Sequence, residues 1–174
     1  MRSWMVVKLP WMGIFFLLSS CALLFPDRTA PKSRDYTVTP PPSPWHKLAT
    51  ADDPSSTDAM KADVAYENPD SGAIISLNSI CRKYSPSSLE ILTNNLVRGI
   101  SNREVMKREE ISLAGAPALD TTFSGLVDNV PLNIRTVVLI KNSCTYDFIY
   151  VTVPKREEKN GPAFDTFLAS FKTE

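Results

Sequence analysis

Three cysteines are the residues of this 174-residue chain that are most able to do chemistry. They are Cys21, Cys81 and Cys144, so 60 and 63 positions separate neighbouring cysteines. This spacing does not favour a catalytic redox pair, which uses two close thiols at the start of a helix. The single histidine, His46, has no second histidine or thiolate cluster nearby in the sequence. We therefore expect no metal site, no catalytic triad and no cofactor.

The residues before Cys21 have the three parts of a secretory signal. Arg2 and Lys8 make the start basic, residues 11–18 form a short apolar centre, and Ser19 and Ser20 are small. A basic start, an apolar centre and small residues at the end are typical of a segment that directs export. The sequence thus predicts a protein that works outside the cytoplasm.

The stretch Leu18-Ser19-Ser20-Cys21 resembles the lipobox of bacterial lipoprotein signal peptides. In that family the cysteine is acylated and becomes the mature N-terminus, so the resemblance implies a signal peptide over 1–20 and a membrane anchor at Cys21. An Asp after the lipidated cysteine favours inner-membrane retention. Ala22 stands there instead, which implies the outer membrane and its periplasmic side. The alternative is an uncleaved membrane helix over 9–25, at the short limit for a span.

The charge balance of the chain argues against a nucleic-acid partner. The chain has 19 basic and 19 acidic side chains, so its net charge is zero. Nucleic-acid binding requires an excess of positive charge, and no run of Lys or Arg indicates it. A length of 174 residues suits one domain with a tail.

A proline-rich stretch divides the chain. The segment 21–61 contains Pro40, Pro41, Pro42 and Pro44 and reads as a lipid anchor followed by an extended tether. The part of this segment that is not expected to behave as a spacer is 45–48, where Trp45 and Leu48 could dock on the domain. We expect the folded domain to span 62–174.

The domain starts with a strand hairpin and a helix. Short strands are expected at 64–66 and 73–80, joined by a turn rich in Asn, Pro and Gly. A helix follows, with Ser85 or Ser87 as its N-cap and an apolar stripe at helical spacing. The stripe consists of Leu89, Leu92, Leu96 and Ile100.

From Val105 onward the hydrophobic period is two. Four strands are expected at 105–113, 119–126, 132–140 and 144–153, with turns at 115–117, 128–129 and 141–143. After Gly161-Pro162 a closing helix is expected, with Phe164, Phe167, Leu168 and Phe171 on one side. The fold class is therefore α+β. An antiparallel sheet of about six strands, in the order β-β-α-β-β-β-β-α, is flanked by helices.

This order resembles the PsbP-like α/β/α sandwich of an extrinsic photosystem II subunit and of bacterial lipoproteins. Three short phrases carry the resemblance, namely 66–69 (YENP), 115–118 (GAPA) and 167–171 (FLASF). The fold hosts binding and assembly roles more often than catalysis. The resemblance thus implies a non-enzymatic protein.

Cys81 and Cys144 remain after Cys21 is assigned to the lipid. An even pair outside the cytoplasm favours a disulfide. Cys81 ends one expected strand and Cys144 starts another, so the two lie at the same end of the sheet if those strands are antiparallel neighbours. The alternative is two buried free thiols.

Two functions stay open. The first is an adaptor or assembly factor that binds another envelope protein. The second is a carrier for a small apolar ligand or lipid, with Tyr146, Phe148 and Tyr150 as its ligand or partner face. A carrier needs an open apolar cavity beside those rings, whereas an adaptor needs a filled core and an exposed apolar patch. Packing under a helix is the other interpretation of the three rings.

Overall fold

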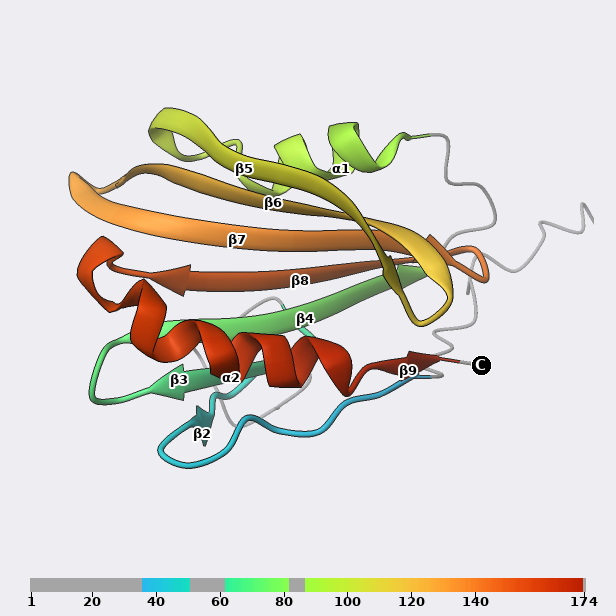
Figure 1. The fold of residues 1–174 in the computed structure, drawn as a ribbon, viewed down its shortest axis with the longest axis horizontal. Coiled ribbons are helices and arrows are strands. Elements are labelled where there is room, and N and C mark those ends of the chain that lie inside the picture. The colour runs from blue at the N-terminus through green and yellow to red at the C-terminus, as the bar shows by residue number, and fades with distance from the viewer. Residues whose placement is uncertain (1–35, 51–61, 82–86, 174) are drawn as a thin grey trace, which may run out of the picture.

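The structure is a computed structural model, and it describes residues 36–50, 62–81 and 87–173. Within these ranges seven strands form one antiparallel sheet (Figure 1). In spatial order the strands are β2 (His46–Lys47), β3 (Val64–Asn68), β4 (Ala73–Cys81), β8 (Cys144–Thr152), β7 (Val130–Lys141), β6 (Ala116–Val127) and β5 (Ser101–Leu113). A second, two-stranded pair joins β1 (Tyr36–Thr37) to β9 (Lys172–Thr173).

Tight turns fix the register of the long strands. Ala114-Gly115, Asp128-Asn129 and Asn142-Ser143 connect β5 to β6, β6 to β7 and β7 to β8, and all six residues have positive φ. Two successive positive φ values make the turn whose twist matches that of a hairpin, which favours Gly, Asn and Asp. The meander of four strands predicted from the sequence is confirmed.

Two helices cover opposite faces of the sheet. In α1 (Leu89–Leu96) the Ser88 hydroxyl accepts the Ile91 amide at 3.3 Å, so Ser88 is the N-cap rather than the predicted Ser85 or Ser87. α1 packs on β6 and β7, whereas α2 (Glu157–Ala169) packs on β8 from the other side. The layers are therefore helix, sheet and helix.

The core has one cluster on each side of the sheet. Under α2, aromatic and aliphatic side chains of β3, β4, β7 and β8 meet Phe164, Phe167 and Phe171. Under α1, a smaller cluster surrounds Phe123 and Ile134. The larger cluster contains most of the buried rings, so it dominates the apolar area removed from water.

The folded domain begins earlier than predicted. Residues 36–50, called the N-terminal strap below, fall within the predicted tether 21–61, in which only 45–48 is expected to dock. In the structure β1 pairs with β9 and β2 pairs with β3. Tyr36, Val38 and Trp45 pack against the larger core cluster. Burial of these three apolar side chains offsets the ordering entropy that a polar spacer could not recover.

The second helix and the strand count also differ from the prediction. α2 starts at Glu157, after a short 3-10 turn η1 (Pro154–Arg156), and Pro162 lies inside it. Proline removes one backbone donor, yet the helix continues because Phe164, Phe167 and Leu168 bury its apolar side. The six predicted strands are β3 to β8, and the strap and C-terminus add the others.

Candidate functional site

Cys81 and Cys144 form a disulfide, as predicted. The two residues stand directly opposite each other where β4 ends and β8 begins. The bond joins the first hairpin to the meander across 63 residues of sequence. Cys21 and the whole predicted signal lie outside the described residues, so the lipid anchor stays a prediction. No helix within 36–50, 62–81 or 87–173 is long and apolar enough to cross a membrane.

Tyr146, Phe148 and Tyr150 lie in the core beneath α2, not on an open face. Each is at most 2% exposed. Phe148 meets Phe171 edge to face at 5.0 Å between ring centroids, and Tyr150 stacks on Phe164 at 5.5 Å. These rings fill the space where a carrier would need its cavity, which favours the packing interpretation.

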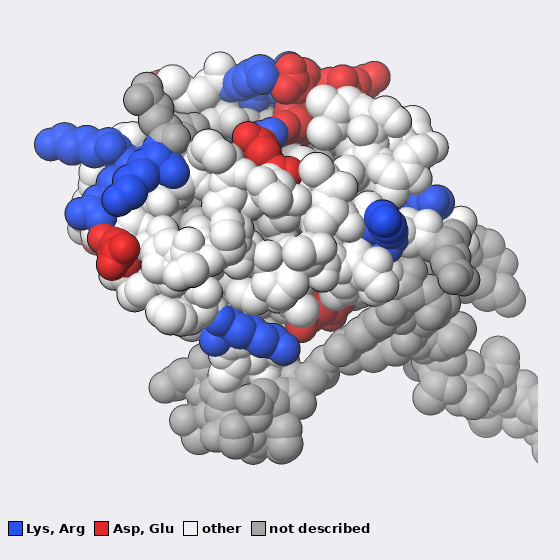
Figure 2. Space-filling model, turned by 60° about the horizontal axis from the view of Figure 1, so that its bottom comes forward, with Lys and Arg blue, Asp and Glu red and all other residues white. Residues whose placement is uncertain are grey.

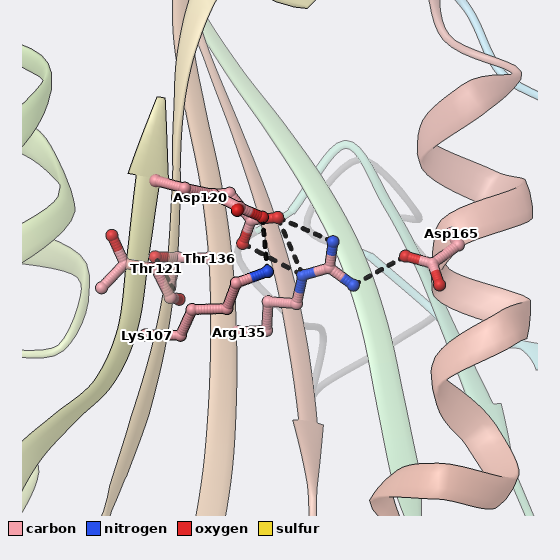
Figure 3. A network of polar contacts seen from close by, with 7 residues as sticks. Lys107, Asp120, Thr121, Arg135, Thr136 and Asp165 are labelled. Atoms are coloured by element: carbon pink, nitrogen blue, oxygen red, sulfur yellow. Dashed lines mark hydrogen bonds and ion pairs between the residues drawn. The ribbon is translucent and has the colours of Figure 1, made fainter. Parts of the chain in front are cut away.

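A network of charged side chains links the sheet to α2 (Figure 3). Arg135 on β7 donates to Asp120 on β6 through two nitrogens, at 3.0 Å (Nε–Oδ1) and 2.7 Å (Nη2–Oδ2). A third nitrogen, Nη1, reaches Asp165 on α2 at 2.6 Å. The guanidinium also lies 5.2 Å from the centroid of the Phe164 ring. Arg135 therefore holds two strands and a helix together.

This network is suited to structure rather than to proton transfer. Burial alone lowers the pKa of Arg135, but the hydrogen bonds and negative charges of Asp120 and Asp165 outweigh burial and raise it above its ordinary value. A guanidinium with a raised pKa stays charged at every physiological pH. Sequence reasoning missed this network, although a charged residue inside an apolar strand is a visible signal.

Asp147 is a second buried charge, on the opposite face of the sheet. Side chains alternate along β8, so Asp147 points away from its neighbours Tyr146 and Phe148 and from α2. It is 6% exposed, and its Oδ1 has no hydrogen-bond partner among the described residues. Burial raises its pKa to about 6. A carboxylate held in this way makes the fold sensitive to pH.

A shallow pocket lies where α1 begins. It has a volume of about 370 Å³. Two of its lining residues form an ion pair, in which Arg108 Nη1 lies 2.8 Å from Glu90 Oε1. The lining residues are Ser88, Leu89, Glu90, Arg108, Glu110 and Leu119. Half of them are charged, so the pocket does not suit the apolar ligand of a carrier. Among the described residues, no group of three His, Cys, Asp or Glu side chains could hold a metal ion.

Four exposed apolar side chains lie on the outer strands β5, β6 and β7, in the part of the sheet nearer the β6–β7 turn. Val105 and Met106, in the first half of β5, are 51% and 64% exposed, and Val105 stands opposite Phe123 of β6. Val127 and Val130, beside the β6–β7 turn, are 37% and 48% exposed. The start of β5 and this turn lie at the same end of the molecule (Figure 1). We call these four residues the strand-end patch.

The comparisons with known proteins show the fold. No protein-family model matches the sequence, and neither does a curated protein. LpqN of Mycobacterium tuberculosis, a protein involved in cell envelope biogenesis, superposes with a TM-score of 0.59 at 13% identity, covering 80% of this chain and 84% of LpqN. CyanoP, the cyanobacterial PsbP of Synechocystis sp. PCC 6803, gives a TM-score of 0.53 at 13% identity, covering 80% and 93%. The chain thus has a PsbP-like fold.

Proposed function

We propose that this protein is a non-enzymatic adaptor of the cell envelope, anchored through a lipid on Cys21. It binds another envelope protein through the strand-end patch and faces the periplasm, with the outer membrane favoured by Ala22. The observation that carries the proposal is the combination of a ring-filled core beneath α2 with four exposed apolar side chains on the outer strands. The envelope role of LpqN, a protein of similar fold, is consistent with this assignment.

The carrier function has less support. It would need an open apolar space beside Phe148 and Tyr150, and those rings contact α2 directly. The pocket beside α1 has a wall that is half charged. An apolar ligand there would desolvate Glu90, Arg108 and Glu110 without replacing their contacts with water.

Site-specific crosslinking tests the adaptor. A photoreactive residue at Val130 should give one crosslinked species in intact cells, because this position lies in the patch. Val130→Asp should abolish the partner's co-purification, since a desolvated charge at an apolar contact is unfavourable. Ile91→Asp is the matched control, because Ile91 is 53% exposed on α1 outside the patch. Equal loss of the partner with both variants would contradict the proposal, and mass spectrometry showing an unmodified Cys21 would remove the anchor.

A further inference from the structure

One broad face of the molecule has no charged side chain in its middle (Figure 2). The strap runs along α2 on this side (Figure 1), and residues 37–45 contain no Lys, Arg, Asp or Glu. Thr39, Pro40, Pro42 and Ser43 of the strap are exposed. We call this surface, the strap residues 37–45 with the neighbouring side of α2, the strap–helix face.

The strap is fixed to α2, so the face is preformed. The Thr39 amide donates to the Ser170 hydroxyl at 2.8 Å, just after α2 ends. Thr166 lies one helical turn before Ser170, on the same side of α2, and is exposed. The Tyr36 ring meets the rings of Tyr146 and Phe171, each at 5.9 Å. A ligand of this face would therefore not have to order it.

Basic side chains stand around the face. Lys47 on β2, Lys159 on α2 and Lys172 on β9 are all exposed. Figure 2 shows Lys and Arg at the left, lower and right edges of the uncharged centre, with most acidic side chains along the upper edge and a few others beside the basic ones. The three lysines are far apart in the sequence, which explains why no basic cluster is visible there.

We propose that the strap–helix face lies on the lipid bilayer, an inference that rests on the proposed anchor at Cys21. Fourteen residues, 22–35, separate Cys21 from Tyr36, which limits the tether to about 50 Å at full extension. The tether joins the domain at the start of the strap, so its length is enough to bring this face to the bilayer. The lysine ammonium groups match the lipid phosphates in charge, and Trp45, half-buried at the end of the strap, suits the membrane interface.

Tryptophan fluorescence tests this orientation. The chain has three tryptophans, Trp4, Trp11 and Trp45, so the mature lipidated protein would retain Trp45 alone. It is reconstituted into vesicles of phosphatidylcholine and phosphatidylglycerol whose acyl chains are brominated near the carbonyl. We expect the lipid to quench Trp45 emission by roughly half or more relative to unbrominated vesicles, because an interfacial indole lies close to that depth.

Charge reversal supplies the matched comparison. Lys47→Glu with Lys172→Glu should remove most of the quenching, whereas Arg98→Glu with Lys107→Glu, two exposed positions outside the face, should leave it unchanged. Circular dichroism checks that both double variants are folded. If the protein floats with vesicles while Trp45 is not quenched, this orientation is wrong and the anchor stands, which leaves the face to a protein partner. If the protein does not float, the anchor fails and this proposal fails with it.

Discussion

Asp147 makes the stability of the fold depend on pH. Its pKa rises from 3.8 to about 6 on folding because burial penalises the charged form. Between these two values the folded state binds more protons than the unfolded state, so the stability contributed by protonated Asp147 is present below pH 4 and is lost as the pH rises through about 6. The buried acid therefore destabilises the fold at neutral pH.

Replacement of this carboxyl tests the argument. Asp147→Asn should raise the free energy of unfolding at pH 7 by roughly 2–3 kcal/mol and leave it nearly unchanged at pH 4, since the amide never ionises. Urea denaturation at both pH values measures the difference. Glu104→Gln, at an exposed position of β5, is the control and should change neither value. An equal effect of Asp147→Asn at both pH values would show that packing, not ionisation, is the cause.

Arg135 shows how a single side chain joins three elements, and its two partners differ in burial. Asp120 is 5% exposed, whereas Asp165 is 60% exposed. A buried pair that loses one partner leaves an uncompensated charge, whereas an exposed pair contributes little.

The two carboxylates can be separated by mutation. Asp120→Asn should lower the free energy of unfolding by about 2–4 kcal/mol, whereas Asp165→Asn should lower it by less than about 1 kcal/mol. Both substitutions keep the size of the side chain, and both replaced carboxylates bind the guanidinium of Arg135, so each variant is the control for the other. Thermal denaturation at neutral pH compares them. Similar losses for both variants would mean that burial does not set the strength of the pair.

Part of this network could be predicted from the sequence. A turn at Asp128-Asn129 sets β6 against β7 so that Arg135 stands opposite Thr122, diagonal to Asp120. Diagonal neighbours on one face are within reach of a long side chain, so the pair follows from the turn alone. Asp165 could not be predicted in this way, because its position depends on how α2 crosses the sheet.

Most of the strap, apart from the docking of 45–48, could not be predicted from the sequence for a related reason. β1 and β2 are two residues long, and β1 pairs with β9 about 135 positions away. Two-residue strands leave no hydrophobic period, and a proline-rich composition is typical of a spacer. The contacts of Tyr36 and Trp45 with the core outweigh that composition. Docking of Trp45 is among the expectations from the sequence, whereas the contact of Tyr36 is revealed only by the folded partner surface.

At the scale of the whole molecule, the two proposed binding surfaces lie on different flanks. The strap and α2 form one flank, and the strand-end patch lies toward the β5–β6 edge on another (Figure 1). With the strap–helix face on a bilayer, as proposed above, the patch would point away from the lipid. Such an arrangement gives an adaptor one surface for its membrane and one for its partner.

Removal of the disulfide tests whether the hairpin β3–β4 and the meander β5–β8 unfold as one unit. Cys81→Ser with Cys144→Ser opens a link across 63 residues of chain, which in the chain-entropy model lowers the free energy of unfolding by up to about 4 kcal/mol. Because β4 and β8 pair over eight positions around the link, we expect the double variant to keep its sheet and to unfold in one transition at lower urea concentration. Reduction of the unmodified protein should give the same midpoint, and Cys21, acylated in the proposed mature form, would not react. Two separate transitions would instead show that the disulfide holds together parts that do not fold cooperatively.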